Sequence, residues 1–169
     1  MAAEHGAVPG SIRDDAARLL AARGLTAAEL RARLARLGHA PPDVEAAVRE
    51  AVHAGWIDDG ALAREVVRAS VARGRGRERV LAQLLSRGIA PQEADAAWEA
   101  LLASGDVDPG ESLRLEVERR VKVEGGALSG RAAARIYNAL LRSGHDPESV
   151  KSALAPYCRG LLGEDDDFP

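Results

Sequence analysis

The feature that most constrains this chain is an internal repeat, in which regularly spaced apolar residues end at a glycine and a proline follows three residues later. These steps lie at 38–41, 88–91 and 144–147, so the glycines are 50 and then 56 residues apart. The apolar positions around each step also recur: Leu30, Leu34, Val44 and Val48; Val80, Leu84, Ala94 and Trp98; Ile136, Leu140, Val150 and Leu154. Self-similarity at this period predicts three stacked units that share their stability with their neighbours.

Each unit is predicted to contain three helices. Glycine suits the left-handed position after a helix C-terminus, and proline suits the first turn of the next helix. Further helix starts are marked by Asp58, Ser129 and Asp146 as N-caps, and by Thr26 with Glu29 as a capping box. The expected helices span 12–22, 27–37, 41–54, 59–73, 77–87, 91–103, 111–124, 130–143 and 147–161.

Composition argues against a substantial sheet. Aromatic residues make up only 3% of the chain within an apolar fraction of 46%, and alanine, the best helix former, is abundant. The predicted fold is all-α, with about nine short helices arranged as three tandem three-helix repeats in an elongated and curved array. The expected divisions are a flexible N-terminus at 1–10, three-helix repeats at 11–57, 58–106 and 107–162, and an acidic C-terminal tail at 163–169.

The number of cysteines and the length of the apolar runs indicate the cellular compartment that the chain is suited to. The single cysteine, Cys158, cannot form a disulfide within the chain, which fits a reducing compartment. The first ten residues include an acid and no sustained apolar run, so no signal peptide is expected. No stretch approaches the roughly 18 uninterrupted apolar residues of a membrane span. We therefore expect a cytoplasmic monomer that makes no membrane contact.

Charge is strongly segregated along the sequence, although the net charge is only −3. Residues 61–90 hold seven arginines against two glutamates, whereas residues 91–111 hold six acids and no base. Residues 112–163 are again basic, with nine bases and five acids. Such alternation predicts one or two basic surfaces on an otherwise acidic molecule.

The arginines of the central basic segment are the leading candidates for a binding site. Arg64 and Arg68 lie one turn apart on the expected helix 59–73, opposite its apolar face, and further arginines follow through the glycine-containing linker. The candidate set is Arg64, Arg68, Arg73, Arg75, Arg77 and Arg79. A compositional excess of arginine would give only a solvated surface, but it does not explain the local scarcity of acids. An anionic partner is therefore favoured, either a phosphate backbone or an acidic protein face.

No catalytic or metal site is predicted. His39 and His145 occupy the same turn position in two repeats, which favours a structural role. Asp58 and Asp59 could form a metal-binding or acid–base pair, but their place before an amphipathic helix favours capping. No strand precedes the Gly-Arg-Gly at 74–76, so a phosphate-binding loop is not expected there. We expect a protein that is not an enzyme and has no cofactor.

Motifs in the central repeat resemble those of the RecX family, whose members are bacterial regulators of the RecA recombinase. They are Gly55-Trp56-Ile57-Asp58-Asp59, Leu62-Ala63-Arg64, Arg73-Gly74-Arg75-Gly76, Val80 with Leu84, and Gly88-Ile89, in that order. The match is densest over about residues 52–98 and extends more weakly through the first repeat. Leu62 and Val66 stand where the family usually has aromatic residues, and the third repeat carries an extra stretch at 124–127.

The resemblance implies a non-enzymatic regulator that binds RecA and RecA–ssDNA filaments in the filament groove. It would inhibit the recombinase, ATPase and coprotease activities, limiting filament extension or promoting disassembly, in homologous recombination, DNA repair and the SOS response. The six central arginines would form the RecA or DNA contact, with Arg131, Arg135 and Arg142 as a secondary set on one helix. Direct contact of these basic faces with ssDNA or dsDNA is compatible with the same pattern.

Two other function classes stay open. Three-helix units resemble helix-turn-helix DNA-binding modules. However, the expected third helix of the central repeat, 91–103, carries three acids and no base, so phosphate would repel it. The other alternative is a helical scaffold for an unrelated protein, with the arginines incidental to binding.

Overall fold

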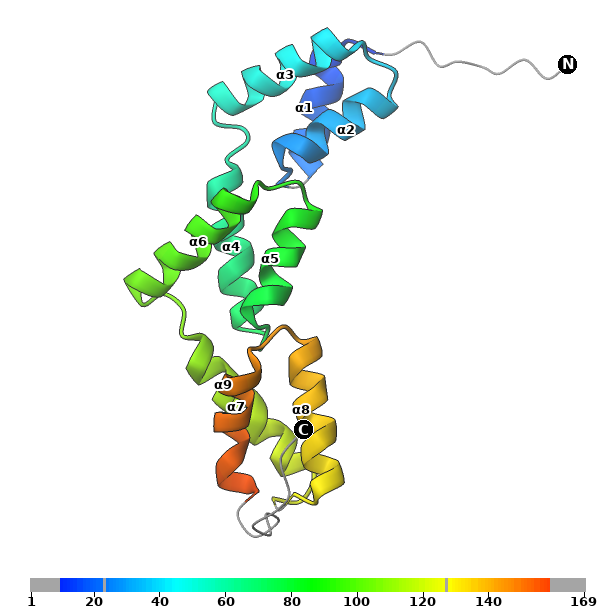
Figure 1. Cartoon of the computed structure of the whole chain (residues 1–169). Coiled ribbons are helices and arrows are strands. Elements are labelled where there is room, and N and C mark those ends of the chain that lie inside the picture. The colour runs from blue at the N-terminus through cyan, green and yellow to red at the C-terminus, as the bar shows by residue number, and fades with distance from the viewer. Residues whose placement is uncertain (1–9, 23, 127, 159–169) are drawn as a thin grey trace, which may run out of the picture.

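The computed structural model describes residues 10–22, 24–126 and 128–158, and in these ranges it contains nine α-helices, one short 3-10 helix and no strand (Figure 1). The all-α prediction is therefore confirmed. The helices are α1 (Ile12–Ala22), α2 (Ala27–Arg36), α3 (Pro41–His53), α4 (Asp59–Val71), α5 (Arg77–Ser86), α6 (Pro91–Ser104), α7 (Pro109–Val123), α8 (Gly130–Arg142), α9 (Pro147–Leu154) and η1 (Ala155–Tyr157).

The predicted helix starts have the expected caps. Thr26 and Glu29 form a complete capping box at α2. Asp58, Ser129 and Asp146 each accept a backbone N–H three residues downstream, at the starts of α4, α8 and α9. These side chains satisfy N–H groups that have no partner within their own helix.

Three helices differ from the predicted ranges by two residues or more. α4 ends at Val71 rather than at 73. α7 begins at Pro109 rather than at 111, because Asp108 caps it by accepting the N–H of Glu111. α9 ends at Leu154 rather than at 161, and the chain tightens into η1. Pro156 lacks the N–H that would continue the α-helical hydrogen bonding. The rest of that predicted helix, 159–161, lies outside the described residues, as do 1–9 of the expected N-terminus and all of the expected acidic tail.

Each group of three consecutive helices encloses its own apolar core. The recurring anchors of the second helices, Leu30 and Leu34, Val80 and Leu84, and Ile136 and Leu140, are between 0% and 4% exposed. The three core clusters are separate, and they lie within residues 16–57, 63–107 and 113–158. Val107, expected to begin the third repeat, packs in the middle core. The cores follow one another along an elongated molecule (Figure 1).

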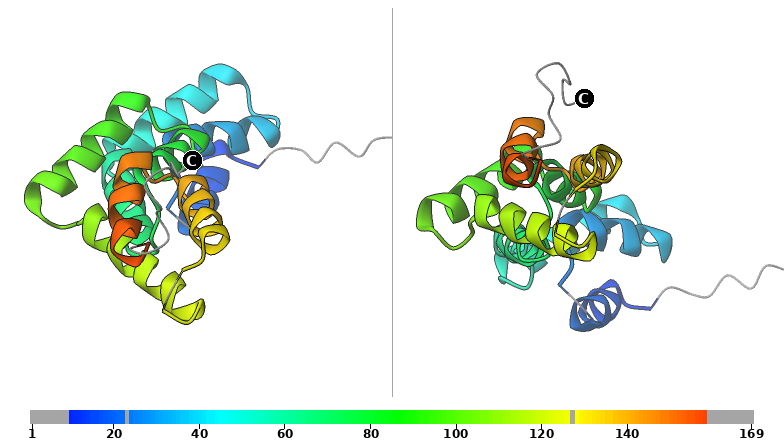
Figure 2. Two further views of the ribbon diagram at one scale, coloured as in Figure 1. Left: turned by 60° about the horizontal axis from the view of Figure 1, so that its bottom comes forward. Right: turned by 90° about the horizontal axis from the view of Figure 1, so that it is seen from below.

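The second helices α2, α5 and α8 lie along the same side of the molecule (Figure 1). Seen from the C-terminal end in the right-hand view of Figure 2, α8 and α9 run roughly along the long axis, whereas α7 lies across it. The successive second helices therefore follow one another along one side and approach each other at their ends.

The end of α8 is joined to the start of α5 through backbone hydrogen bonds. Gly76 N donates to Ser143 O at 2.9 Å, and Glu78 N donates to Gly144 O at 3.2 Å. Gly144 has φ of +86°, and a Cβ there would lie 2.3 Å from Arg79 N. Glycine at this position is therefore required both by the left-handed conformation and by the close approach of another helix.

The start of α2 is joined to the end of α5 mainly through side chains. Thr26, which is fully buried, donates its Oγ1 hydroxyl to Arg87 O at 2.7 Å. The Arg87 guanidinium donates to both carboxylate oxygens of Glu29, at 2.8 and 2.9 Å. Asp59 Oδ1 accepts the N–H of Ala27 at 3.1 Å, so Asp59 links the first two triplets instead of capping its own helix.

The pKa values of two carboxyl groups at this junction are shifted in opposite directions. Hydrogen bonds from Arg87 lower the pKa of Glu29, and their effect exceeds that of burial. Burial raises the pKa of Asp59, in spite of the N–H that it accepts from Ala27. The charged form of Glu29 is therefore favoured by folding, whereas that of Asp59 is disfavoured.

Replacing Gly76 with alanine is expected to loosen the joint between α5 and α8. A Cβ at Gly76 would lie 2.1 Å from Gly144 O, which is a backbone atom and cannot move without displacing α8. We expect Gly76→Ala to lower the free energy of unfolding by about 2–3 kcal/mol. Urea unfolding followed by circular dichroism measures this loss. The matched control is Gly130→Ala at the first position of α8, where an added Cβ meets nothing within 4 Å. Equal stability of the two variants would contradict the close packing.

The charge of Glu29 is expected to stabilise the chain fully where that group is ionised in both the folded and the unfolded state. Its lowered pKa means that this stabilisation is fully present above the unfolded value of about 4.3 and is lost as pH falls through the lower folded value. At pH 7, Glu29→Gln should cost about 1–2 kcal/mol of unfolding free energy. The cost should shrink below about pH 4, as measured by urea unfolding across pH. Glu78→Gln, an exposed glutamate without an ion pair among the described residues, is the control.

Candidate functional site

The six central arginines lie on α4, in the turn that follows it and in the first turn of α5. Arg64 and Arg68 project from α4, Arg73 and Arg75 lie in the turn, and the other two begin α5. All six side chains are exposed. The face of α4 opposite Arg64 and Arg68 buries Ala63, Val67, Ser70 and Val71, as the amphipathic pattern of this helix predicts.

Two of the six arginines are neutralised by acids that the fold brings to them. Arg68 Nη2 lies 2.8 Å from Asp106 Oδ2, and Arg77 Nη2 lies 2.7 Å from Asp95 Oδ1 and 3.9 Å from Glu99 Oε1. These acids belong to the stretch 91–111, whose helix α6 packs against α4 and α5. The charge segregation seen along the sequence is therefore partly cancelled in three dimensions.

The remaining four arginines keep an uncompensated charge. Arg64, Arg73, Arg75 and Arg79 form no ion pair with any residue in the described ranges. Three of these, Arg73, Arg75 and Arg79, lie within seven residues at the turn and the start of α5, beside the end of α8. We call these three arginines the basic turn. Exposed guanidinium groups without carboxylate partners can bind phosphate or carboxylate groups.

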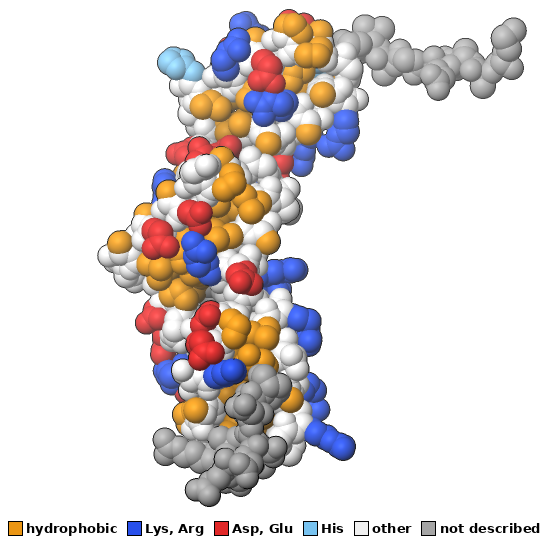
Figure 3. Space-filling view, in the orientation of Figure 1, with side chains coloured by type: hydrophobic (Ala, Val, Ile, Leu, Met, Phe, Trp, Pro, Cys, Tyr) orange, Lys and Arg blue, Asp and Glu red, His pale blue; other side chains and the backbone are white. Residues whose placement is uncertain are grey.

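The secondary candidates on α8, Arg131, Arg135 and Arg142, also include both ion-paired and unpaired arginines. Arg135 Nη2 lies 2.5 Å from Glu124 Oε1, whereas Arg131 and Arg142 form no ion pair with another described residue. Both are exposed on α8. Figure 3 shows Lys and Arg side chains along the edge formed by α8 and the neighbouring end of α5. The structure therefore extends the positive surface of the basic turn along α8.

One residue of the positive surface was missed in the sequence. Arg33 is half-buried, has no ion pair within the described part of the chain, and lines a hollow of about 470 Å³ between α2 and α4 together with Arg73. Residues 1–60 hold seven bases and nine acids, so the net negative charge of this segment gives no indication of a basic surface at Arg33. Gln83 stands at the same position of the next repeat and carries no charge, so the repeat pattern does not mark Arg33 either.

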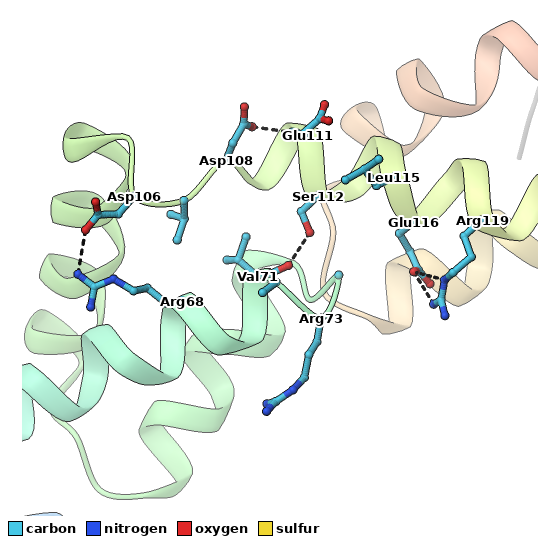
Figure 4. Close-up of a pocket in the computed structure, with 13 residues that line it drawn as sticks. Arg68, Val71, Arg73, Asp106, Asp108, Glu111, Ser112, Leu115, Glu116 and Arg119 are labelled. Carbon is cyan, nitrogen blue, oxygen red and sulfur yellow. Dashed lines mark hydrogen bonds and ion pairs between the residues drawn. The ribbon is translucent and has the colours of Figure 1, made fainter.

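A larger hollow, of about 710 Å³, lies between the end of α4 and the start of α7. Figure 4 shows the Arg68–Asp106 pair at one end and the Glu116–Arg119 pair at the other. Between them Ser112 Oγ donates to Val71 O at 2.5 Å. Burial opposes ionisation of Glu116, but hydrogen bonds from Arg119 and Arg120 outweigh it and lower its pKa. The rim of this hollow is thus charged, and most of its charged groups are paired, either with each other or with the neighbouring Arg114 and Arg120.

His39, His145 and the paired aspartates Asp58 and Asp59 are occupied by structural contacts. His39 Nε2 lies 2.8 Å from Asp15 Oδ2, and His145 Nε2 lies 2.9 Å from Gly74 O. Asp58 caps α4, and Asp59 accepts from α2. Within the described ranges, no three His, Cys, Asp or Glu side chains are placed to hold a metal ion. The chemistry these surfaces offer is binding of anionic groups by arginine.

The basic turn is expected to dominate binding to a polyanion. Replacing Arg73, Arg75 and Arg79 together with alanine should lower the salt concentration that elutes the chain from heparin, because uncompensated charges supply most of the attraction. Replacing three ion-paired arginines, Arg31, Arg77 and Arg114, changes the net charge equally and should shift elution less. Equal shifts would show that net charge alone governs binding. Circular dichroism should show both variants folded, since surface substitutions usually cost within about 0.5 kcal/mol.

None of the described helices is both long enough and apolar enough to span a bilayer. No family model matches the sequence, and no curated protein matches it. Among solved structures, RecX from Lactobacillus salivarius is similar, with a TM-score of 0.72 and 17% sequence identity. The similarity covers 86% of this chain and 94% of that chain. It thus extends over nearly the whole array of helices rather than over a single triplet. The chain has a RecX-like fold.

Proposed function

We propose that this chain is a cytoplasmic, monomeric, non-enzymatic regulator that binds RecA and RecA–ssDNA filaments in the filament groove. It inhibits the recombinase, ATPase and coprotease activities of RecA by limiting filament extension or promoting disassembly. The observation that carries this proposal is the RecX-like arrangement over 86% of the chain. The ordered motifs of the central repeat support it independently, since they are read from the sequence alone.

The physical form of the molecule also supports the proposal. An elongated array can contact successive subunits of a filament, so weak contacts from each triplet add through effective concentration (Figure 1). The exposed charges that remain unpaired, on the basic turn and at Arg131 and Arg142, are suited to acidic protein groups or to phosphates. Arg64 belongs to the same proposed contact, whereas Arg68, Arg77 and Arg135 are already held by carboxylates.

Direct DNA binding is the second candidate function. The unpaired arginines favour it, but α6, the third helix of the central triplet, does not act as a recognition helix in this interpretation. Asp95 and Glu99 of α6 lie 2.7 and 3.9 Å from the Arg77 guanidinium, so the charged groups that α6 contributes to these ion pairs are acids. Phosphate would be repelled by such a helix. Any DNA contact is therefore assigned to the basic turn and α8 and is independent of sequence.

The chain at sub-stoichiometric concentration should suppress the ssDNA-dependent ATPase of RecA. Changing Arg73, Arg75 and Arg79 to alanine should raise the concentration for half-inhibition by about tenfold, since several charge-assisted contacts are lost. The control with Arg31, Arg77 and Arg114 changed should remain within about twofold. Absence of inhibition by the unaltered chain at equimolar concentration would contradict the proposed function.

Binding to naked ssDNA in a salt titration distinguishes the second candidate. A steep fall in affinity with salt indicates phosphate contacts. Inhibition of RecA without measurable binding to naked DNA would assign the basic turn to an acidic protein face.

A further inference from the structure

The exposed face of α8 carries a single row of polar side chains that donate hydrogen bonds. The row consists of Arg131, Arg135, Asn138 and Arg142, and all four are exposed. Their spacing of four, three and four residues places them on one face of the helix, since each residue turns the chain by about 100°. At a rise of about 1.5 Å per residue, the row is about 16 Å long. We call it the α8 stripe.

Most of the α8 stripe is not neutralised by the described residues. Arg135 is paired with Glu124, whereas Arg131 and Arg142 form no ion pair with another described residue. α8 itself contains no acid. The large apolar side chains that are exposed elsewhere in the described chain include none from α8. A surface with arginines and without an apolar anchor is suited to an acidic segment rather than to an apolar one.

Such an acidic segment is present in the same chain. The described residues end at Cys158, and six residues further the sequence reads Glu164-Asp165-Asp166-Asp167. In an extended chain, with about 3.3 Å per residue, the first and last of these acids are about 10 Å apart. Arginine side chains are long enough to cover the remaining length of the α8 stripe. The four carboxylates therefore match the stripe in both charge and length.

The path of the chain brings this segment to the α8 stripe. Only four residues separate α8 from α9, and the two helices pack against each other in the third core, so they run in opposite directions. The end of α9 therefore lies at the end of the molecule where α8 begins (Figure 1). From Cys158, six residues reach at most about 20 Å and nine reach about 30 Å. Both Arg131 and Arg142 are within this range, whereas the first triplet lies at the opposite end of the elongated molecule (Figure 1).

We infer that residues 164–167 dock along the α8 stripe and pair with Arg131 and Arg142, in competition with the anionic partner of this surface. The inference rests on the proposed function only for the identity of that partner. Exposed ion pairs are individually weak, but attachment to the same chain gives the segment an effective concentration in the millimolar range. The docked segment thus lowers the affinity for an external polyanion, and a partner with many negative groups displaces it.

The direct test is nuclear magnetic resonance of the full chain labelled with nitrogen-15. The variant Glu164→Gln, Asp165→Asn, Asp166→Asn and Asp167→Asn removes the four charges of the segment. We expect the side-chain N–H signals of Arg131 and Arg142 to shift relative to the unaltered chain, and those of the arginines in the first triplet to stay unchanged. The matched control neutralises four exposed acids of the first two triplets, Asp14, Asp43, Glu65 and Glu93, and should leave the α8 signals in place.

Heparin binding at low salt tests the competition. Removing the four charges of the segment should raise the affinity for heparin by about fivefold or more, because Arg131 and Arg142 become available to it. The control variant should gain less than about twofold, since its charges lie far from the α8 stripe and are screened by salt. In a chain that also carries Arg131→Ala and Arg142→Ala, neutralising the segment should have less than about a twofold effect, as expected for two coupled sites.

Three results would overturn the inference. Unchanged α8 signals in the neutralised variant would show that the segment does not contact the stripe. Equal gains in heparin affinity for the neutralised variant and the control would show that net charge alone is responsible. Signal shifts that grow with protein concentration would assign the contact to a second copy of the chain. If the expected shifts are observed in a chain that does not inhibit RecA, the docking is supported and only the proposed function is contradicted.

Discussion

The structure depends on the way in which helix ends satisfy one another between triplets. A helix leaves N–H groups without partners at its start and C=O groups without partners at its end, and burying either costs free energy unless a partner is found. The start of α5 donates to the terminal carbonyls of α8, which meets both needs in one contact. The opposite charges of the two helix ends also attract each other. Small separate cores can therefore be assembled into one elongated molecule without a large apolar interface between them.

The two joints use this principle with different chemistry. Between α5 and α8 the contact is made by backbone atoms, and glycines at 76 and 144 permit the close approach. Between α2 and α5 the contact is made by side chains, through Thr26 to Arg87 and through Arg87 to Glu29. The first joint depends on the absence of side chains, whereas the second depends on charge and is sensitive to acid.

The same folding that joins the triplets also decides which charges are free. Acids that are distant in sequence neutralise Arg68, Arg77 and Arg87, and the unneutralised arginines remain at the turn before α5. A positive surface thus lies at this turn, next to a hollow whose rim carries both arginines and carboxylates.

The sequence alone determined the helices and their order, because local signals decide them. Capping side chains, glycines after helix ends and prolines in first turns act within a few residues, and apolar periodicity identifies the buried face of each helix. These signals placed most helix boundaries within two residues, and they failed at α9, where Pro156 ended the α-helix early. The expected repeat boundaries at 57–58 and 106–107 remain predictions about folding units.

The tertiary structure decided the roles of charged residues, since these depend on distant partners. Asp59 was expected to cap a helix, and its oxygens instead accept an N–H from α2. Arg87 contributed to the basic segment in sequence, yet it is held by Glu29. Arg33, in an acidic segment, makes no ion pair among the described residues, although its charge also helps to lower the pKa of Glu29. Coulombic and hydrogen-bonding contacts act through space over a few ångströms, and sequence separation does not report that distance. The sequence therefore determined where the helices begin and end, and only the packing of the triplets decided which arginines remain free to bind.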